Sequence, residues 1–336
     1  AYNNVEGLNL EPGTYISIIG KDDSSSYWTN VKKGVMQAAD DLNKELGYKG
    51  SDKIKVTYNA PAKSEDIDEQ VNILDEELSR YPDAVGIASI DSAACSVQFD
   101  LATANGIPII SLDSGNEYKG IQCIVKTDNE DAARTGAYKL ANEIGDEGQV
   151  ILVVHDSNSE TAKERAKSFE EEIKNNYPSV SIVETIYCDK LDDLKKKIAL
   201  EKDPNISEDL QKAAVEKMTD DEVMQYYLKK YPDLKGVFGT NESSTIFALE
   251  ALQKTELAGK VTLVGFDISE EQTAAMKNGE IAGLVVQNPF GMGYASVVAA
   301  ARTVLQSGNE AVVDTGYIWV TKDNLEDESI QNMLYK

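Results

Sequence analysis

Histidine is almost absent from this chain, because His155 is the only one among 336 residues. A single histidine supports neither a histidine-based metal cluster nor an HExxH helix. A Ser-His-Asp triad stays open, but the sequence has no GxSxG segment to present a nucleophilic serine. We therefore expect no metal and no enzymatic activity, and we expect His155 to be a loop residue at a strand end.

Cysteine is scarce as well. Cys95, Cys123 and Cys188 form no CxxC pair, so neither a zinc site nor a full disulfide framework is indicated. Free cysteine behaves as a compact apolar side chain. We expect small buried thiols, with a single disulfide among the three as the alternative.

Positive charge is also in deficit. The 33 Lys and Arg residues against 58 Asp and Glu residues give a formal charge of −25. Nucleic acids and anionic membranes bind basic surfaces, so we exclude both as partners. No apolar run approaches the roughly 20 residues of a membrane helix. Hydrophobic residues at 41% and charged residues at 27% are typical of a folded protein, and the length suggests roughly two domains.

Phosphate and calcium motifs are missing too. Residues 20–26, which follow the first predicted strand, read GKDDSSS instead of GxGxxG, and no P-loop occurs elsewhere. The segment that begins at Asp156 starts like an EF-hand loop, but Thr161 stands where glycine is needed and Lys167 stands where the last carboxylate is needed. We expect no nucleotide, no bound Ca²⁺ and no cofactor.

What the sequence does contain is an alternation of strands and helices. The first unit is a β-branched apolar run at 14–20 and an amphipathic helix at 27–46, which Gly47 ends. Further strands are expected at 53–59, 84–90, 107–112, 149–154, 180–187, 236–239, 261–266 and 283–287. Helices are expected at 64–80, 92–105, 129–144, 160–176, 243–254, 269–278 and 292–306. This order predicts an α/β fold of two lobes, each a doubly wound parallel sheet.

One connection is longer than a crossover requires. Residues 190–231 separate two strands by some forty residues, are rich in charge and contain Pro204, whereas a crossover needs only about a dozen. We expect a normal helix plus an inserted helical excursion around 203–218. A solvated surface hairpin without a function is the simplest interpretation of it.

Polar side chains stand where the predicted strands end. In doubly wound sheets the ligand crevice lies at these carboxyl ends. The candidates there are Ser25, Asp91, Asp113, Arg165, Asn241, Asp267 and Gln287. Carboxylates accept from hydroxyls, arginine donates, and the amides do both, which suits an alcohol-rich ligand. Tyr27 and Trp28 could stack on the apolar face of a sugar ring or could equally pack into the core at the helix start.

Five ordered segments carry a resemblance to a known family. They are IPIISLD at 107–113, AKERAKSF at 162–169, GVFGTNE at 236–242, VGFD at 264–267 and VVQNPFGMG at 285–293. Together they resemble the type I periplasmic sugar-binding proteins of ABC transporters, the ribose- and galactose-binding group, over about 14–320.

The resemblance assigns roles to these candidates. It implies that Asp113, Arg165, Asn241, Asp267 and Gln287 bind ligand hydroxyls. It also places Ser25 where ribose binders often have Asn, and it matches Tyr27 and Trp28 to the paired aromatics of the first loop. Ser114 departs from the family, because ribose binders usually have Arg there. The aromatic expected near 189–192 is also unclear, since Lys190 and Leu191 stand there.

The same resemblance implies an architecture. Three crossings near 126–127, 287–288 and 316–317 would join one lobe of 1–126 plus 288–316 to another of 127–287 plus 317–336. Ligand bound to both lobes would favour the closed form.

The function implied is capture of a pentose or hexose outside the cytoplasm. The expected partner is an ABC transporter permease, with a chemoreceptor or sensor kinase as a second candidate partner, and the expected state is a monomer. Residues 1–4 carry neither an initiator Met nor a basic leader, so we expect a secretion or lipoprotein signal to have been removed before Ala1.

Other functions are compatible with parts of the pattern. A receptor for a furanosyl autoinducer or a nucleoside uses the same fold and similar acids. The ligand-binding core of a LacI-like regulator would need a basic helix-turn-helix before the first strand, which here begins at Thr14. An enzyme is disfavoured because no nucleophile–base pair or cofactor fingerprint is present.

Overall fold

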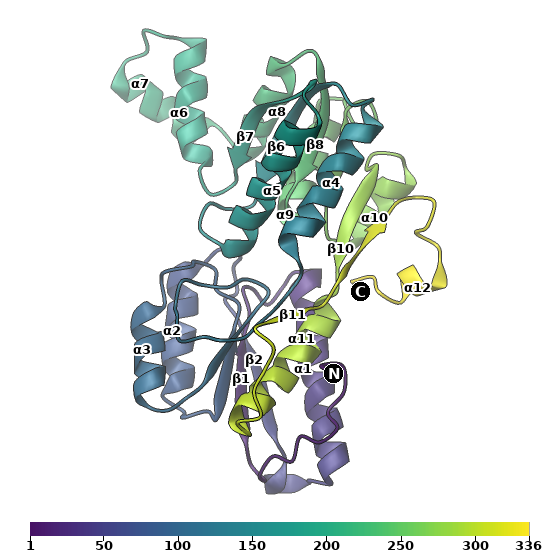
Figure 1. The fold of residues 1–336 in the computed structure, drawn as a ribbon. Coiled ribbons are helices and arrows are strands. Elements are labelled where there is room, and N and C mark those ends of the chain that lie inside the picture. Colours follow the sequence, from purple (N-terminus) through teal and green to yellow (C-terminus); the bar gives the residue numbers. More distant parts are fainter. Residues whose placement is uncertain (336) are drawn as a thin grey trace.

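A computed structural model describes residues 1–335 and shows two six-stranded sheets, one above the other (Figure 1). The first sheet has the order β11(Val312–Asp314), β5(Ile124–Lys126), β4(Ile109–Leu112), β3(Ala84–Ile87), β1(Tyr15–Ile19), β2(Lys55–Asn59). The second has the order β12(Tyr317–Val320), β10(Gly283–Gln287), β9(Thr262–Phe266), β8(Leu234–Gly239), β6(Gly148–Val154), β7(Val180–Tyr187). Every pairing is parallel except that of β12 with β10. We call the parts of the chain built on these sheets the first and second lobes.

Helices follow most of the strands, which confirms the α/β prediction. They are α1(Ser26–Leu46), α2(Ile67–Leu78), α3(Ser96–Ala104), α4(Asn129–Glu143), α5(Glu160–Asn176), α6(Leu191–Lys202), α7(Glu208–Lys217), α8(Asp220–Lys230), α9(Glu242–Lys254), α10(Glu270–Lys277), α11(Pro289–Val304) and α12(Glu328–Gln331), with a 3₁₀ turn at Gly50–Asp52. Among residues 1–335, no helix combines the length and the apolar character needed to span a bilayer.

The boundaries of several elements differ from those expected. The helix predicted at 92–105 begins at Ser96, because the carboxylate of Asp91 accepts from the amide of Ala93 and holds a turn there. The strand predicted at 53–59 begins at Lys55, after the 3₁₀ turn. The short strands β5, β11 and β12 were not predicted. They have three or four residues each, too few for a periodic pattern.

Helix α1 ends before Gly47, as predicted, and begins at Ser26, one residue before the predicted start. The Ser25 hydroxyl accepts from the amide of Trp28 at the N-terminus, and Gly47 at φ 70° ends the helix. The helix packs very closely on α11. A Cβ atom on Gly34 would lie 2.0 Å from the Phe290 carbonyl oxygen, and one on Gly293 would lie 2.0 Å from that of Val31. Only glycine permits this approach of two backbones.

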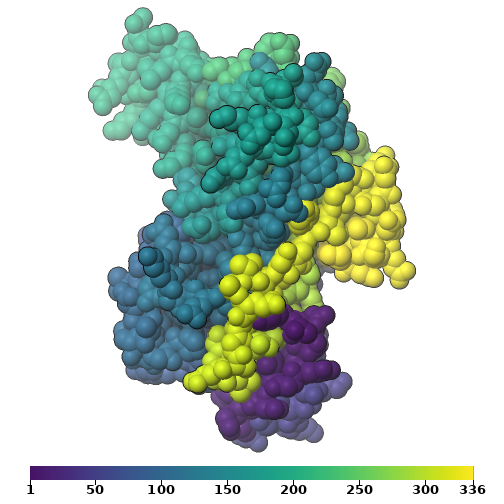
Figure 2. Space-filling model, viewed as in Figure 1, coloured from purple at the N-terminus to yellow at the C-terminus, as the bar shows by residue number. Residues whose placement is uncertain are grey.

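The chain passes between the two sheets three times. It leaves the first sheet after β5 and enters the second lobe at α4, and it returns after β10 through α11, which packs against α1. The last passage runs from β11 in the first sheet to β12 in the second. Figure 2 shows the resulting C-terminal segment lying along both lobes on one side of the molecule.

The long segment at 190–231 forms three helices. Helix α8 buries Val223, Met224, Tyr227 and Leu228 and packs against α9. Helix α7 buries none of its residues, and together with α6 it projects away from the second lobe (Figure 1).

The three cysteines are free in the structure. Cys95 and Cys123 are buried, and Cys188 is half-buried. Burial raises the pKa of the Cys95 thiol to about 11 and that of the Cys188 thiol to about 12, so both are protonated at neutral pH.

Candidate functional site

A cavity of about 170 Å³ lies between the lobes at the carboxyl ends of their strands. Eight of the nine predicted residues line it: Ser25, Tyr27, Trp28, Asp113, Arg165, Asn241, Asp267 and Gln287. The other lining residues are Lys21, Asp22, Ser24, Ser64, Glu65, His155, Thr161, Glu242 and Ser243. Both lobes therefore contribute hydrogen-bonding groups to one cavity.

Asp113 follows β4 in the first lobe. Its backbone is left-handed, at φ 60°, a conformation that Asp tolerates better than most residues. The hydroxyl of Tyr27 donates to Asp113 Oδ1 at 2.6 Å, and the Lys21 ammonium lies 3.5 Å from Oδ2. The carboxylate is thus fixed from one side by a phenol and from the other by a cation.

Asp267 occupies the equivalent place in the second lobe. It follows β9 and is also left-handed, at φ 69°. Gln287 Nε2 donates to its Oδ1 at 2.7 Å, and the backbone amide of Glu242 donates to its Oδ2 at 3.1 Å. Burial raises the pKa of Asp267, and the positive charge of Arg165 opposes that rise.

Arg165 and Gln287 form a network where the chain leaves β10. Arg165 donates through Nη2 to Gln287 Oε1 at 3.0 Å and through Nη1 to the Thr240 carbonyl at 2.7 Å. Its Nε donates to Asn129 Oδ1 at 3.0 Å, and its guanidinium lies 4.3 Å from the centre of the Phe266 ring. Three donors of Arg165 are thus engaged with the protein, so this residue supports the site as well as lining it.

Tyr27 and Trp28 are both buried and both line the cavity, and their rings contact each other. Tyr27 is buried, and its ring contacts those of Trp28 and Tyr335 edge to face. Its hydroxyl points to Asp113. The sequence left both aromatics two roles, stacking on a sugar ring or packing into the core. The contacts of Tyr27 instead make it a positioning residue for the carboxylate.

Asn241 and Ser25 are both helix caps. Asn241 Oδ1 accepts from the amide of Ser244 at the start of α9, as Ser25 accepts from Trp28 at the start of α1. Among residues 1–335, the structure shows no protein partner for Asn241 Nδ2, which leaves a donor available at the cavity.

Asp91 is the one candidate that does not line the cavity. Strand β3 ends at Ile87, so Asp91 lies four residues beyond it, where its carboxylate binds the amide of Ala93. We therefore leave Asp91 out of the proposed site.

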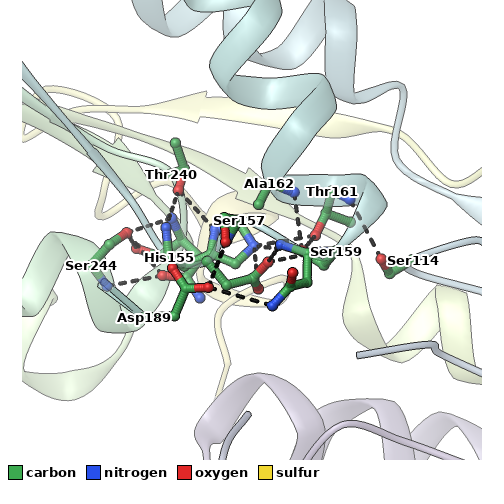
Figure 3. Close-up of polar contacts among 12 residues, drawn as sticks. Ser114, His155, Ser157, Ser159, Thr161, Ala162, Asp189, Thr240 and Ser244 are labelled. Carbon is green, nitrogen blue, oxygen red and sulfur yellow. Dashed lines mark hydrogen bonds and ion pairs between the residues drawn. The ribbon is translucent and has the colours of Figure 1, made fainter. Parts of the chain in front are cut away.

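His155 lines the cavity although only a loop role was expected of it. Nδ1 lies 2.7 Å from Thr240 Oγ1, and Nε2 lies 3.2 Å from Thr161 Oγ1 (Figure 3). Burial lowers the pKa of His155, so the ring is neutral at physiological pH. In the described part of the chain, no three His, Cys, Asp or Glu side chains gather to hold a metal ion.

Contacts across the cleft hold the lobes together. The amide of Thr161 donates to the Ser114 hydroxyl of the first lobe at 3.4 Å (Figure 3). Three further links are Ser26 to Glu242 at 2.6 Å, Lys163 to Ser92 at 3.1 Å and Lys126 to Glu164 at 2.6 Å. The arrangement is that of a closed cleft.

Several residues of this region were not predicted as site residues from the sequence, among them Lys21, Glu242 and Tyr335. Lys21 and Glu242 each follow a residue that the sequence analysis singled out, the strand end Gly20 and the candidate Asn241, so this adjacency was their only signal. Tyr335 had no signal, because it lies 48 residues from its partner Gln287.

Comparison with known proteins identifies the family of this chain. A family model described as a periplasmic binding protein domain matches residues 16–309. The ribose import binding protein RbsB of Bacillus subtilis is 23% identical over 278 residues, which cover 82% of this chain and 77% of that protein. The RbsB protein of Haemophilus influenzae is 25% identical, with 85% of this chain and 84% of that protein covered.

Two solved structures share the fold. A carbohydrate transporter solute-binding protein of Agrobacterium radiobacter, in complex with D-arabinose, has a TM-score of 0.79 and 28% identity, covering 96% of this chain and 98% of that one. An ABC transporter solute-binding protein of Agrobacterium vitis with bound D-fucose has a TM-score of 0.78 and 26% identity, covering 96% and 100%. Families of this kind bind solutes for sugar transport and are not enzymes. The chain belongs to the periplasmic binding protein family, as one of its type I sugar-binding proteins.

Proposed function

We propose that this protein captures a monosaccharide, a pentose or a hexose, outside the cytoplasm and delivers it to the permease of an ABC transporter. The observation that carries the proposal is the pair Asp113 and Asp267. Each follows a strand of a different lobe in the same left-handed conformation, and both line one cavity. A sugar that bridges the two carboxylates gains contacts only in the closed form, so it favours closure.

In this proposal the lobes comprise 1–126 plus 288–316 and 127–287 plus 317–336, with 190–231 as a helical insertion in the second. The sheet membership of β5, β10, β11 and β12 supports these limits. Asp113, Asp267 and Gln287 accept from sugar hydroxyls, and Arg165 and Asn241 donate. Trp28 covers the apolar face of the ring, and Ser25 lies beside it. We also propose that the protein works as a monomer, since both halves of the cavity come from one chain.

Isothermal titration calorimetry against pentoses, hexoses, nucleosides and a furanosyl autoinducer tests the ligand class. We expect one or more monosaccharides to bind with a stoichiometry of one per chain, and we expect Asp113→Ala to lose that binding. Asp91→Ala is the matched control, because Asp91 follows a strand of the same sheet but lies outside the cavity. Binding of nucleosides or autoinducer alone, or silence from every sugar, overturns the proposal.

A further inference from the structure

The charge of the cavity is not balanced. Five acidic side chains line it, those of Asp22, Glu65, Asp113, Glu242 and Asp267. Burial raises the pKa of the Glu65 carboxyl to about 8, so four of the five are counted as negative charges. The only permanently charged cations in the same lining are Lys21 and Arg165, and His155 is neutral because burial lowers its pKa. Carboxylates held together away from water are costly unless a positive charge compensates them.

Both cations are already committed to other groups. Lys21 pairs with Asp113, and Arg165 donates to Asn129, Thr240 and Gln287. Within residues 1–335, the structure brings no Lys or Arg nitrogen within 4.0 Å of the carboxylates of Asp22, Glu242 or Asp267. The excess negative charge of the cavity therefore lies around Asp22, Glu242 and Asp267.

Glu242 is at the centre of that excess. It is the first residue of α9, its Oε1 accepts from Ser26 of the first lobe, and its amide donates to Asp267. Burial raises the pKa of Glu242 to about 7, and the negative charges of Asp267 and Asp22 add to the rise. In the Glu242 carboxylate, Oε1 is the only oxygen with a protein partner among the described residues. Oε2 is therefore available to a ligand.

A second carboxylate shows the same shortage of donors. Asp156 is 1% exposed, and its Oδ2 has no hydrogen-bond partner within residues 1–335. Glu65 of the first lobe, which lines the cavity, lies against it. Glu65 and Asp156, from opposite lobes, thus lie against each other beside the cavity, which Asp156 itself does not line.

We propose that the sugar bound in this cavity carries an amino group, and that Glu242, flanked by Asp22 and Asp267, binds it as an ammonium. This inference rests on the proposed function and narrows its substrate class. An ammonium has three donors and one positive charge, so it satisfies several carboxylate oxygens at once and restores their ionisation. A hydroxyl brings one donor and no charge. Charge-assisted hydrogen bonds of this kind are about twice as strong as neutral ones.

Calorimetry with matched sugar pairs tests this. Each pair consists of a neutral hexose and the same hexose with one hydroxyl replaced by an amine, for example D-glucose with D-glucosamine and D-galactose with D-galactosamine; the N-acetylated forms serve as uncharged controls. We expect at least one amino sugar to bind about tenfold or more tightly than its neutral parent at pH 7.5. Binding of neutral sugars with no amino sugar preferred overturns the inference and leaves the proposed function intact. If neither neutral sugars nor amino sugars bind, both this inference and the proposed function are wrong.

The variant Glu242→Gln assigns the preference to one residue. It keeps the size of the side chain and an acceptor for Ser26, and it removes the negative charge. We expect the affinity ratio of amino to neutral sugar to fall toward one, while Glu69→Gln, an exposed glutamate on α2, leaves the ratio unchanged. A ratio that Glu242→Gln does not change overturns the assignment. Circular dichroism of each variant confirms that it is folded.

Discussion

The hydroxyl oxygen of Tyr335 lies 2.8 Å from the backbone nitrogen of Gln287, which donates to it. The single proton of that hydroxyl faces two acceptors, the Gln287 carbonyl and Asp267 Oδ1, each 3.1 Å away. Tyr335 is 3% exposed, and its ring contacts that of Tyr27. The end of the described chain is therefore part of the polar network beneath the cavity.

Replacing Tyr335 by Phe removes only the hydroxyl. The amide of Gln287 then lacks its acceptor and Asp267 loses a donor, so we expect a loss of about 1–3 kcal/mol in the free energy of unfolding. We also expect weaker sugar binding, because Asp267 is less well fixed. Urea denaturation and calorimetry measure the two effects. Tyr81→Phe is the control, because Tyr81 is 73% exposed. Equal stability of the two variants contradicts the prediction.

Arg165→Ala is expected to impair both binding and folding. It leaves Gln287 Oε1, the Thr240 carbonyl and Asn129 Oδ1 each without a charged donor. Gln287 Oε1 keeps the Thr127 hydroxyl as a donor, whereas the other two acceptors lose theirs. Each unsatisfied buried group costs about 1–3 kcal/mol, so we expect a loss of at least about 2 kcal/mol in stability. Arg165→Lys keeps the positive charge but lacks the planar guanidinium group, so it should retain only part of the stability that Arg165→Ala loses. Thermal unfolding of the pair measures the difference, and an unchanged melting temperature for Arg165→Ala contradicts the network.

The close contact between α1 and α11 predicts a strong effect of one methyl group. In Gly293→Ala the new Cβ would lie 2.0 Å from the Val31 carbonyl oxygen, which is backbone and cannot rotate away. The helices must separate, and overpacking of this kind typically costs about 1–3 kcal/mol. Lys32→Ala, on the exposed side of α1, is the control. Denaturant midpoints of the two variants test the prediction, and equal midpoints refute the close packing.

The raised pKa of Glu242 predicts a pH dependence of stability without ligand. The folded protein binds this proton more tightly than the unfolded chain, so the group favours folding at low pH, and that contribution declines as the pH rises from about 4.5 to about 7. Glu242→Gln abolishes this decline. Its melting temperature relative to the parent should therefore rise by about 2 °C or more between pH 5 and pH 8. Scanning fluorimetry at the two pH values measures it, and a constant difference means that Glu242 does not titrate in this range.

Local pattern was enough to predict most of the fold. Burial on both faces makes β6 a continuous apolar run, and Gly47 marks the end of α1. The candidates Asp113 and Asp267 could be found because a parallel sheet places the residues after its strands at one edge. These features depend on neighbours in the sequence, so the sequence alone determined them.

The tertiary structure decided what depends on distant partners. Strands β5, β11 and β12 are too short to show a period and exist because they pair with neighbouring strands that lie far away in the sequence. The orientation of Tyr27 toward Asp113 and the burial of Tyr335 beside Gln287 join residues 86 and 48 positions apart. The excess of carboxylates in the cavity appears only when both lobes face each other. Contacts between residues so far apart in the sequence leave no local pattern, so only the folded chain reveals them.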